Sequence, residues 1–298
     1  DNTRVVPFAL LMEFHALAAV KNNPGLVLSG MDQVRLVKGA RQEHDHMVLD
    51  IHLSRCRAEK SGYPIESKIT ATGAGGTETA HSSCRILLAD RLAKPPVLSA
   101  AAFMSLEPYP LSVAEAYDTV LFHGSDLQGI QAINGHSEKG IEVVTRPAPE
   151  PSRWLSTLPA SGWTLEPMML DAAFQAAILW SHVHKGQACL PAYVANFRLY
   201  RSFAGHEGDI RILFTVNEQS DSRIKGYITF LNQQDVVIAS ITGFEAVLSP
   251  SLADKFKNRP LFDRKSILAF AQGNPSEAFG APYKPFDTER QIARLPRP

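Results

Sequence analysis

The run EPMMLDAAFQAAILW, residues 166–180, holds an aspartate, Asp171, and a glutamine, Gln175, within an apolar sequence typical of a buried helix. Removing an isolated carboxylate from water is strongly unfavourable, so such a group tends to keep its proton and its pKa rises. A carboxyl of raised pKa can act as a general acid near neutral pH. Gln175 lies one helical turn after Asp171, where its amide can hydrogen-bond the carboxyl.

A second interpretation of Asp171 is structural. Aspartate is favoured at helix N-caps, because its side chain accepts a backbone hydrogen bond and its charge suits the positive end of the helix. The residues alone leave both roles open, and the two can coexist.

Histidines are the other candidate groups. His15 falls within a predicted first helix and is expected to be a buried or helix-end histidine, not a base. His44 and His46 alternate along a predicted strand, and His182 and His184 stand at the end of the second helix. Neither pair has a third ligand at metal-type spacing, so no metal site is predicted.

A weak internal repeat predicts how the chain positions these residues. A helical apolar run at Phe8–Val20 leads to a strand-like segment at Val34–Lys38, and a run at Asp171–Val183 leads to a similar segment at Phe197–Arg201. The two units keep a constant offset of 163 residues, which predicts a duplication. Both helices are apolar on nearly all sides, as expected for helices inside a fold.

Alternating segments typical of antiparallel strands follow each unit, at residues 46–58 and 83–92 and then at 209–217, 225–233 and 235–248. A long apolar helix wrapped by a curved antiparallel sheet, occurring twice, predicts an α+β double hotdog. Residues 73–83 lack the Lys-Ser/Thr ending of a phosphate-binding loop and are expected to form a hairpin tip. Ser125 lacks the glycines of a nucleophile elbow.

The expected organisation has four parts. They are an N-terminal hotdog at 1–100, a proline-rich linker at 101–112, a C-terminal hotdog at 113–249 and a tail toward a following domain at 250–298. The tail contains a short helix candidate at Arg264–Gly273.

Three segments, LFHGSDLQGI (121–130), LDAAFQAA (170–177) and LPAYVANFRLY (190–200), together resemble the dehydratase domains of polyketide and polyunsaturated fatty acid synthases, which are double hotdogs. Asp171 and Gln175 match the Asp-x-x-x-Gln/His motif of that family. The first segment is similar to its Tyr-Gly-Pro-x-Phe-Gln motif, with His123 where tyrosine is usual and with Gly124 and Gln128 retained. The resemblance covers about residues 3 to 249.

The resemblance implies a reaction. In the family, a histidine removes the α proton of a β-hydroxyacyl thioester, and an aspartic acid, here Asp171, protonates the departing hydroxyl to give a trans-alkene and water. The histidine belongs to a His-x3-Gly-x4-Pro motif whose proline matches Pro7. By that spacing the base would lie upstream of Asp1, with Asn2 in the place of the motif's glycine.

Two further residues have implied supporting roles. Gly124 would approach the thioester carbonyl with its backbone N–H, or be an ordinary turn glycine. His123 would donate to the substrate as the usual tyrosine does, or be a satisfied structural histidine.

Partners and cofactors also follow from the resemblance. No soluble cofactor is implied, because the substrate arrives on the phosphopantetheine arm of an acyl carrier protein. Residues 267–298 are similar to the segment that leads into a FabA-like dehydratase in polyunsaturated fatty acid synthases, so neighbouring synthase domains are expected partners.

Composition argues against other classes of protein. Thirty basic residues balance thirty acidic ones, which favours neither nucleic acid nor an anionic membrane surface. Apolar runs fall far short of the roughly 20 residues that cross a bilayer, and the first residues lack the features of a secretory signal. Cys56, Cys84 and Cys189 are odd in number and widely spaced, which fits a reducing cytoplasm.

The first hypothesis is therefore a β-hydroxyacyl-ACP dehydratase, a hydro-lyase. A second is a degenerate dehydratase that binds acyl chains or spaces its neighbours without elimination. A third is a product-template cyclase, which shares the double hotdog and a His/Asp pair, although the tail argues against it.

Overall fold

The computed structural model describes residues 4–42, 48–60, 62–73, 76–98, 105–154, 162–203 and 208–248. Several expectations lie outside these residues and stay predictions, namely those for Asn2, His44, His46, the tail at 250–298 and its helix candidate at 264–273.

Two long helices dominate the interior. Helix α1 spans Phe8–Asn22 and helix α4 spans Pro167–Lys185. Nearly every residue of α1 up to Ala19 and every residue of α4 up to Ser181 is buried. The prediction of two core helices that are apolar nearly all round is therefore confirmed. Helix α4 starts earlier than the predicted run because Pro167 occupies its first turn, where the missing N–H of proline is no loss.

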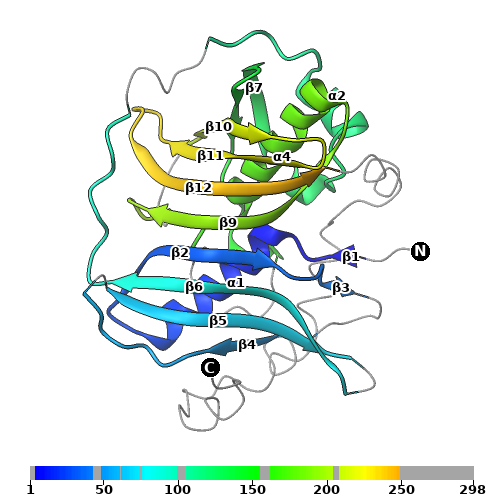
Figure 1. The fold of residues 1–298 in the computed structure, drawn as a ribbon. Helices are drawn as coiled ribbons and strands as arrows, with labels where there is room; N and C mark the ends of the chain where they lie inside the picture. The colour runs from blue at the N-terminus through cyan, green and yellow to red at the C-terminus, as the bar shows by residue number, and fades with distance from the viewer. Residues whose placement is uncertain are drawn as a thin grey trace.

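Ten strands form one antiparallel sheet within the described residues. From edge to edge the order is β4 (Asp50–Leu53), β5 (Tyr63–Thr72), β6 (Glu78–Ala89), β2 (Val27–Leu36), β9 (Cys189–Leu199), β12 (Val237–Leu248), β11 (Arg223–Leu231), β10 (Ile210–Gln219), β8 (Gly140–Thr145) and β7 (Ile130–Ser137). Figure 1 shows the first-half strands, in blue to cyan, beside those of the second half, in green to orange, with α1 and α4 behind them. The α+β double hotdog is therefore confirmed.

The two halves meet where β2 pairs with β9. Met31 lies opposite Phe197 and Val34 opposite Val194, so the strand units of the repeat are neighbours in space. The backbones approach closely at Gly30, where an added Cβ would collide with the carbonyl oxygen of Phe197. A side chain at this position is therefore excluded by the pairing of the two halves.

Three strands of the sheet, β5, β7 and β8, are absent from the sequence-based prediction. In β5 the inward face carries Ile65, Ser67 and Ile69, and the buried Ser67 interrupts the apolar alternation. Ser67 faces the core because its hydroxyl hydrogen-bonds the buried His15. The predicted strand at 46–58 is shorter than expected, since β4 covers only Asp50–Leu53.

Shorter elements complete the fold. They are β1 (Arg4–Val5), β3 (Arg41–Gln42), α2 (Val113–Thr119), the 3-10 helix η2 (Ser125–Leu127) and α3 (Pro151–Trp154). Helix α2 begins with a capping box, in which Ser112 and Glu115 satisfy each other's backbone N–H groups.

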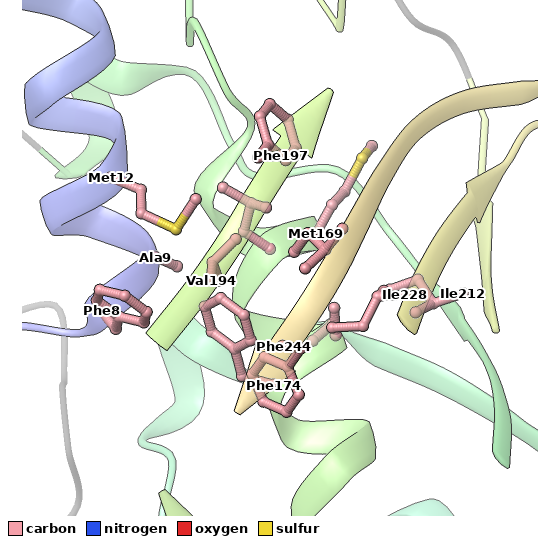
Figure 2. Packing of buried hydrophobic residues seen from close by; sticks show 14 of the residues in the cluster. Phe8, Ala9, Met12, Met169, Phe174, Val194, Phe197, Ile212, Ile228 and Phe244 are labelled. Atoms are coloured by element: carbon pink, nitrogen blue, oxygen red, sulfur yellow. The ribbon is translucent and has the colours of Figure 1, made fainter. Parts of the chain in front are cut away.

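The main core runs between both helices and the sheet. Phe174 of α4 lies between Phe8 of α1 and Phe244 of β12, with ring centroids 5.6 Å away on each side. Figure 2 shows these rings together with Met12, Met169 and Val194. Each fully buried aromatic or aliphatic side chain of this kind contributes about 1.5–3 kcal/mol by leaving water, so the start of α4 is held firmly against α1.

Among the described residues, no helix is long and apolar enough to cross a membrane. The three cysteines form no disulfide with one another. Burial raises the pKa of the Cys84 and Cys189 thiols, which makes them poor nucleophiles.

Candidate active site

Asp171 lies in the second turn of α4 and is only 4% exposed. The helix cap is instead Glu166, whose carboxylate accepts a hydrogen bond of 3.0 Å from the backbone N–H of Met169. The interpretation of Asp171 as an N-cap is therefore wrong. Its carboxyl points into the fold from within a formed helix.

Two buried glutamates fix the start of α4. Glu13 of α1 accepts hydrogen bonds from the backbone N–H groups of Thr164 (2.9 Å) and Leu165 (2.6 Å). Glu166, whose φ is 61°, also accepts one from the N–H of Ala148 at 2.5 Å. Burial raises the pKa of each carboxyl to about 7, against the opposing effect of these hydrogen bonds. Together they tie the N-terminus of α4 to α1 and to the segment after β8.

Gln175 contacts Asp171 as its position in the helix predicts. Its Nε2 donates to Oδ2 of Asp171 and to the carbonyl oxygen of Leu127, both at 2.8 Å. Burial raises the pKa of Asp171 to about 7, and the hydrogen bond from Gln175 acts in the opposite direction. The carboxyl can therefore hold a proton near neutral pH, which a general acid requires.

A small cavity of about 10 Å³ borders Asp171. It is otherwise lined by apolar or ring-bearing residues, namely Pro7, Ala9, Leu10, Leu127, Trp154 and Pro167. This volume corresponds to about one water molecule. Pro7, predicted as a site residue, stands at the start of α1 and so meets the start of α4 across this cavity.

His123 reaches the same carboxyl from the segment between α2 and η2. Its Nε2 lies 3.4 Å from Oδ2 of Asp171, and its ring stacks on Phe122. Burial lowers the pKa of His123 to about 3, so the imidazole is neutral at physiological pH. Its Nδ1 is buried and has no hydrogen-bond partner among the described residues. A bare acceptor is tolerated better than an orphaned donor, which favours the tautomer with the proton on Nε2, facing Asp171.

Gly124 follows His123 and caps η2, with φ of −63°. That conformation is open to any residue, so the backbone geometry does not require glycine here. Gln128 holds the segment through a 3.4 Å hydrogen bond from its Nε2 to the carbonyl oxygen of His123. The predicted role of Gly124 toward a thioester stays a prediction.

Tyr117 of α2 belongs to the same cluster but is absent from the sequence-based prediction. Its hydroxyl donates to Oε1 of Gln175 at 2.7 Å and accepts from the backbone N–H of Ile130 at 2.9 Å. A single tyrosine in a polar stretch gave no signal of this contact, because 58 residues separate it from Gln175.

Comparison with known proteins identifies the family. Residues 105–255, just over half of the chain, match the family described as "PS-DH: Polyketide synthase dehydratase N-terminal domain". The chain belongs to the polyketide synthase dehydratase family. The matched range contains Tyr117, His123, Asp171 and Gln175.

A curated relative of this dehydratase chain is a polyunsaturated fatty acid synthase polypeptide of Thraustochytrium sp. (strain ATCC 26185 / S-3), 24% identical over 199 residues. The alignment covers 66% of the chain but only 7% of that relative.

Solved dehydratase domains share the fold. The dehydratase domain from the CurF module of curacin polyketide synthase is 17% identical with a TM-score of 0.65, covering 83% of this chain and 88% of that one. A trans-AT polyketide synthase dehydratase domain from Brevibacillus brevis is 18% identical with a TM-score of 0.65, covering 83% and 86%.

His15 and His184 have structural surroundings in this dehydratase chain. Both ring nitrogens of His15 are hydrogen-bonded, Nδ1 to the hydroxyl of Ser67 at 2.6 Å and Nε2 to that of Ser82 at 3.0 Å. Burial lowers its pKa to about 3. His184 contacts His136 at 3.0 Å, at the far end of α4 from Asp171. Within the described parts of the chain, no group of three or more His, Cys, Asp or Glu residues is arranged to hold a metal ion.

Proposed function

We propose that the chain catalyses loss of water from a β-hydroxyacyl thioester to give a trans-enoyl thioester, with Asp171 as the general acid. The main support for this proposal is the burial and the raised pKa of the Asp171 carboxyl. Asp171 is buried against a cavity the size of a water molecule, and burial raises its pKa to about 7.

The proposed reaction balances as an elimination. A general base takes the α proton, and the C–H electron pair becomes the new double bond. The bond from the β carbon to oxygen breaks with its electron pair on oxygen, which takes the Asp171 proton and leaves as water. The family resemblance assigns the base to a histidine upstream of Asp1, and Asp171 recovers its proton before the next cycle.

The other predicted site residues support this chemistry. Gln175 contacts the acid, and Pro7 lines the cavity with it. His123 is neutral, and its Nε2 lies close enough to the acid to donate a weak hydrogen bond to Asp171. We further propose that the substrate is carried on the phosphopantetheine of an acyl carrier protein, that no soluble cofactor takes part, and that the neighbouring domains are those of a cytoplasmic synthase.

Turnover tests the proposal directly. The chain, with any residues that precede Asp1 in the natural protein, is incubated with a β-hydroxyacyl-pantetheine thioester, and the alkene is measured by mass. Asp171→Asn should abolish product, whereas Asp221→Asn, a change at an exposed aspartate, should not. The rate should fall as the pH rises above about 7, because the acid loses its proton. Undiminished turnover by Asp171→Asn would falsify the assignment.

One observation favours a second candidate, a degenerate dehydratase that spaces its neighbouring domains without elimination. The cavity beside Asp171 is about 10 Å³ and therefore much too small for an acyl chain. The two candidates differ in one measurement. A degenerate spacer domain would neither bind the thioester, as measured by calorimetry, nor form alkene with the upstream residues present.

A further inference from the structure

A directional chain of hydrogen bonds leads to the acid. The backbone N–H of Ile130 donates to the Tyr117 hydroxyl, which donates to Oε1 of Gln175, whose Nε2 donates to Oδ2 of Asp171. The three distances are 2.9, 2.7 and 2.8 Å. This series of hydrogen bonds joins strand β7, helix α2 and helix α4.

Backbone groups set the direction of this chain. The N–H of Ile130 can only donate, so the oxygen of Tyr117 accepts there and uses its own proton toward Gln175. The carbonyl of Leu127 can only accept, so the nitrogen of the Gln175 amide must face Leu127 and Asp171. Neither Tyr117 nor Gln175 can reverse its role without leaving a buried backbone group unsatisfied.

These hydrogen bonds make the two carboxyl oxygens of Asp171 different from each other. Oδ2 of Asp171 accepts from Gln175 and lies 3.4 Å from Nε2 of His123, which favours keeping it unprotonated. The described residues place no hydrogen bond on Oδ1. The acidic proton therefore belongs on Oδ1, the oxygen that is open to a reacting group.

We propose that Tyr117 is a positioning residue for the acid: it holds the Gln175 amide so that Oδ2 of Asp171 is the acceptor and Oδ1 carries the proton for the leaving hydroxyl. This inference rests on the proposed dehydration. Tyr117 acts through Gln175 and does not touch the reacting atoms.

The surroundings of Tyr117 suit this role. Burial raises the pKa of Tyr117 well above its ordinary range, so its hydroxyl keeps its proton and stays a donor. The groups facing the acid from the packed elements are the neutral His123 and Tyr117 itself. Neither of these two groups changes its charge between pH 5 and pH 9. Glu13 and Glu166, which bind the start of α4, have pKa values of about 7 as well, so the titration must be read from the signal of Asp171 itself.

The experiment compares two tyrosines. Tyr117→Phe removes the hydroxyl that holds Gln175. Tyr109→Phe is the matched control, because the Tyr109 hydroxyl also donates to α4, at the carbonyl of Leu179, but has no link to Asp171. The readout is the carboxyl titration of Asp171 in protein labelled with 13C-aspartate, assigned by the signal that Asp171→Asn removes.

In the natural protein the hydrogen bond from Gln175 lowers the pKa of Asp171. We expect Tyr117→Phe to loosen this bond and so to raise that pKa. The midpoint should rise by about half a unit to one unit, and kcat should fall about 2- to 10-fold with little change in KM. Tyr109→Phe should leave the midpoint unchanged. An unchanged midpoint in Tyr117→Phe, or an equal rise in both variants, would overturn the proposal.

A second variant guards against failure to fold. Gln175→Met removes the group that receives the Tyr117 hydrogen bond but keeps the bond from Ile130. It should raise the Asp171 midpoint as Tyr117→Phe does, and adding Tyr117→Phe to it should have no further effect. The titration needs no turnover, so an inactive natural protein would count against dehydration while the midpoints still decide the role of Tyr117.

Discussion

Nε2 of His123 lies 3.4 Å from Oδ2 of Asp171, and both side chains are almost completely buried. Burial acts on the two groups in opposite directions, raising the pKa of Asp171 to about 7 and lowering that of His123 to about 3. Both groups are therefore neutral between about pH 3 and pH 7, where the contact is a weak dipolar one and not an ion pair.

The first prediction concerns stability. The raised pKa of Asp171 stabilises the fold fully below the ordinary aspartate pKa, and this stabilisation is lost as the pH rises through about 7. Asp171→Asn has no such dependence. The unfolding free energy of Asp171→Asn minus that of the natural protein should therefore increase by about 2–3 kcal/mol as the pH rises from 5 to 8. Urea denaturation measures both values. If the unfolding free energies of the two proteins changed with pH in parallel, the result would contradict the burial of the Asp171 carboxyl.

The second prediction concerns His123→Phe. Phenylalanine removes the buried, unpartnered Nδ1 and can keep the stacking on Phe122, so the free energy of unfolding should stay the same or rise. Turnover should nevertheless fall, by about 2- to 10-fold, because Asp171 loses a neighbouring N–H group. His123→Tyr, which introduces the residue usual in the family, is the control and should keep most activity. Denaturation and turnover per folded molecule are measured on the same samples.

The third prediction concerns Glu13→Gln. One amide oxygen replaces the two carboxyl oxygens that serve Thr164 and Leu165, and the amide NH2 would face one of these backbone N–H groups, so at pH 5 the fold should lose about 1–3 kcal/mol. The pKa of Glu13 is raised to about 7, so the natural protein itself loses stability as the pH rises toward 8. The difference between the two proteins should therefore shrink at high pH. Glu59→Gln, at an exposed carboxylate, should show no such trend, and a difference that grows with pH would count against this account.

The fourth prediction concerns Gly30→Ala. The added methyl group would collide with the carbonyl of Phe197 across the β2–β9 pairing, and such overpacking destabilises by about 1–3 kcal/mol. Gly39→Ala is the matched control, since its Cβ would meet Val5 at an ordinary 3.8 Å. Thermal unfolding compares the two. Equal midpoints would mean that the halves are not held in this register.

The two long helices and most strands could be predicted because their signals are local, whereas the short helices α2 and α3 were not. Asp171 and Gln175 were accessible in the same way, because one helical turn separates them in the sequence. The alignment of the repeat to Phe8 put the start of the second helical run at Asp171, whereas Glu166 caps the helix and Pro167 begins it.

Long-range polar contacts were not predictable. In the sequence, Ser67 interrupts the apolar alternation of a strand, and only the structure shows that it hydrogen-bonds His15. Nothing near Tyr117 in the sequence indicates its hydrogen bond to Gln175. Each pairing depends on the completed sheet, which no window of sequence contains.

The repeat places Phe8 at the position that Asp171 occupies in the second copy, at the same offset of 163 residues. Two identical subunits would have to carry the same side chain twice, so an acid in one would require an acid in the other. Two halves within one chain are free of that constraint, because each position is a separate residue. One helix can then carry an aspartate at the matching position while its counterpart carries a phenylalanine that packs in the core against Phe174.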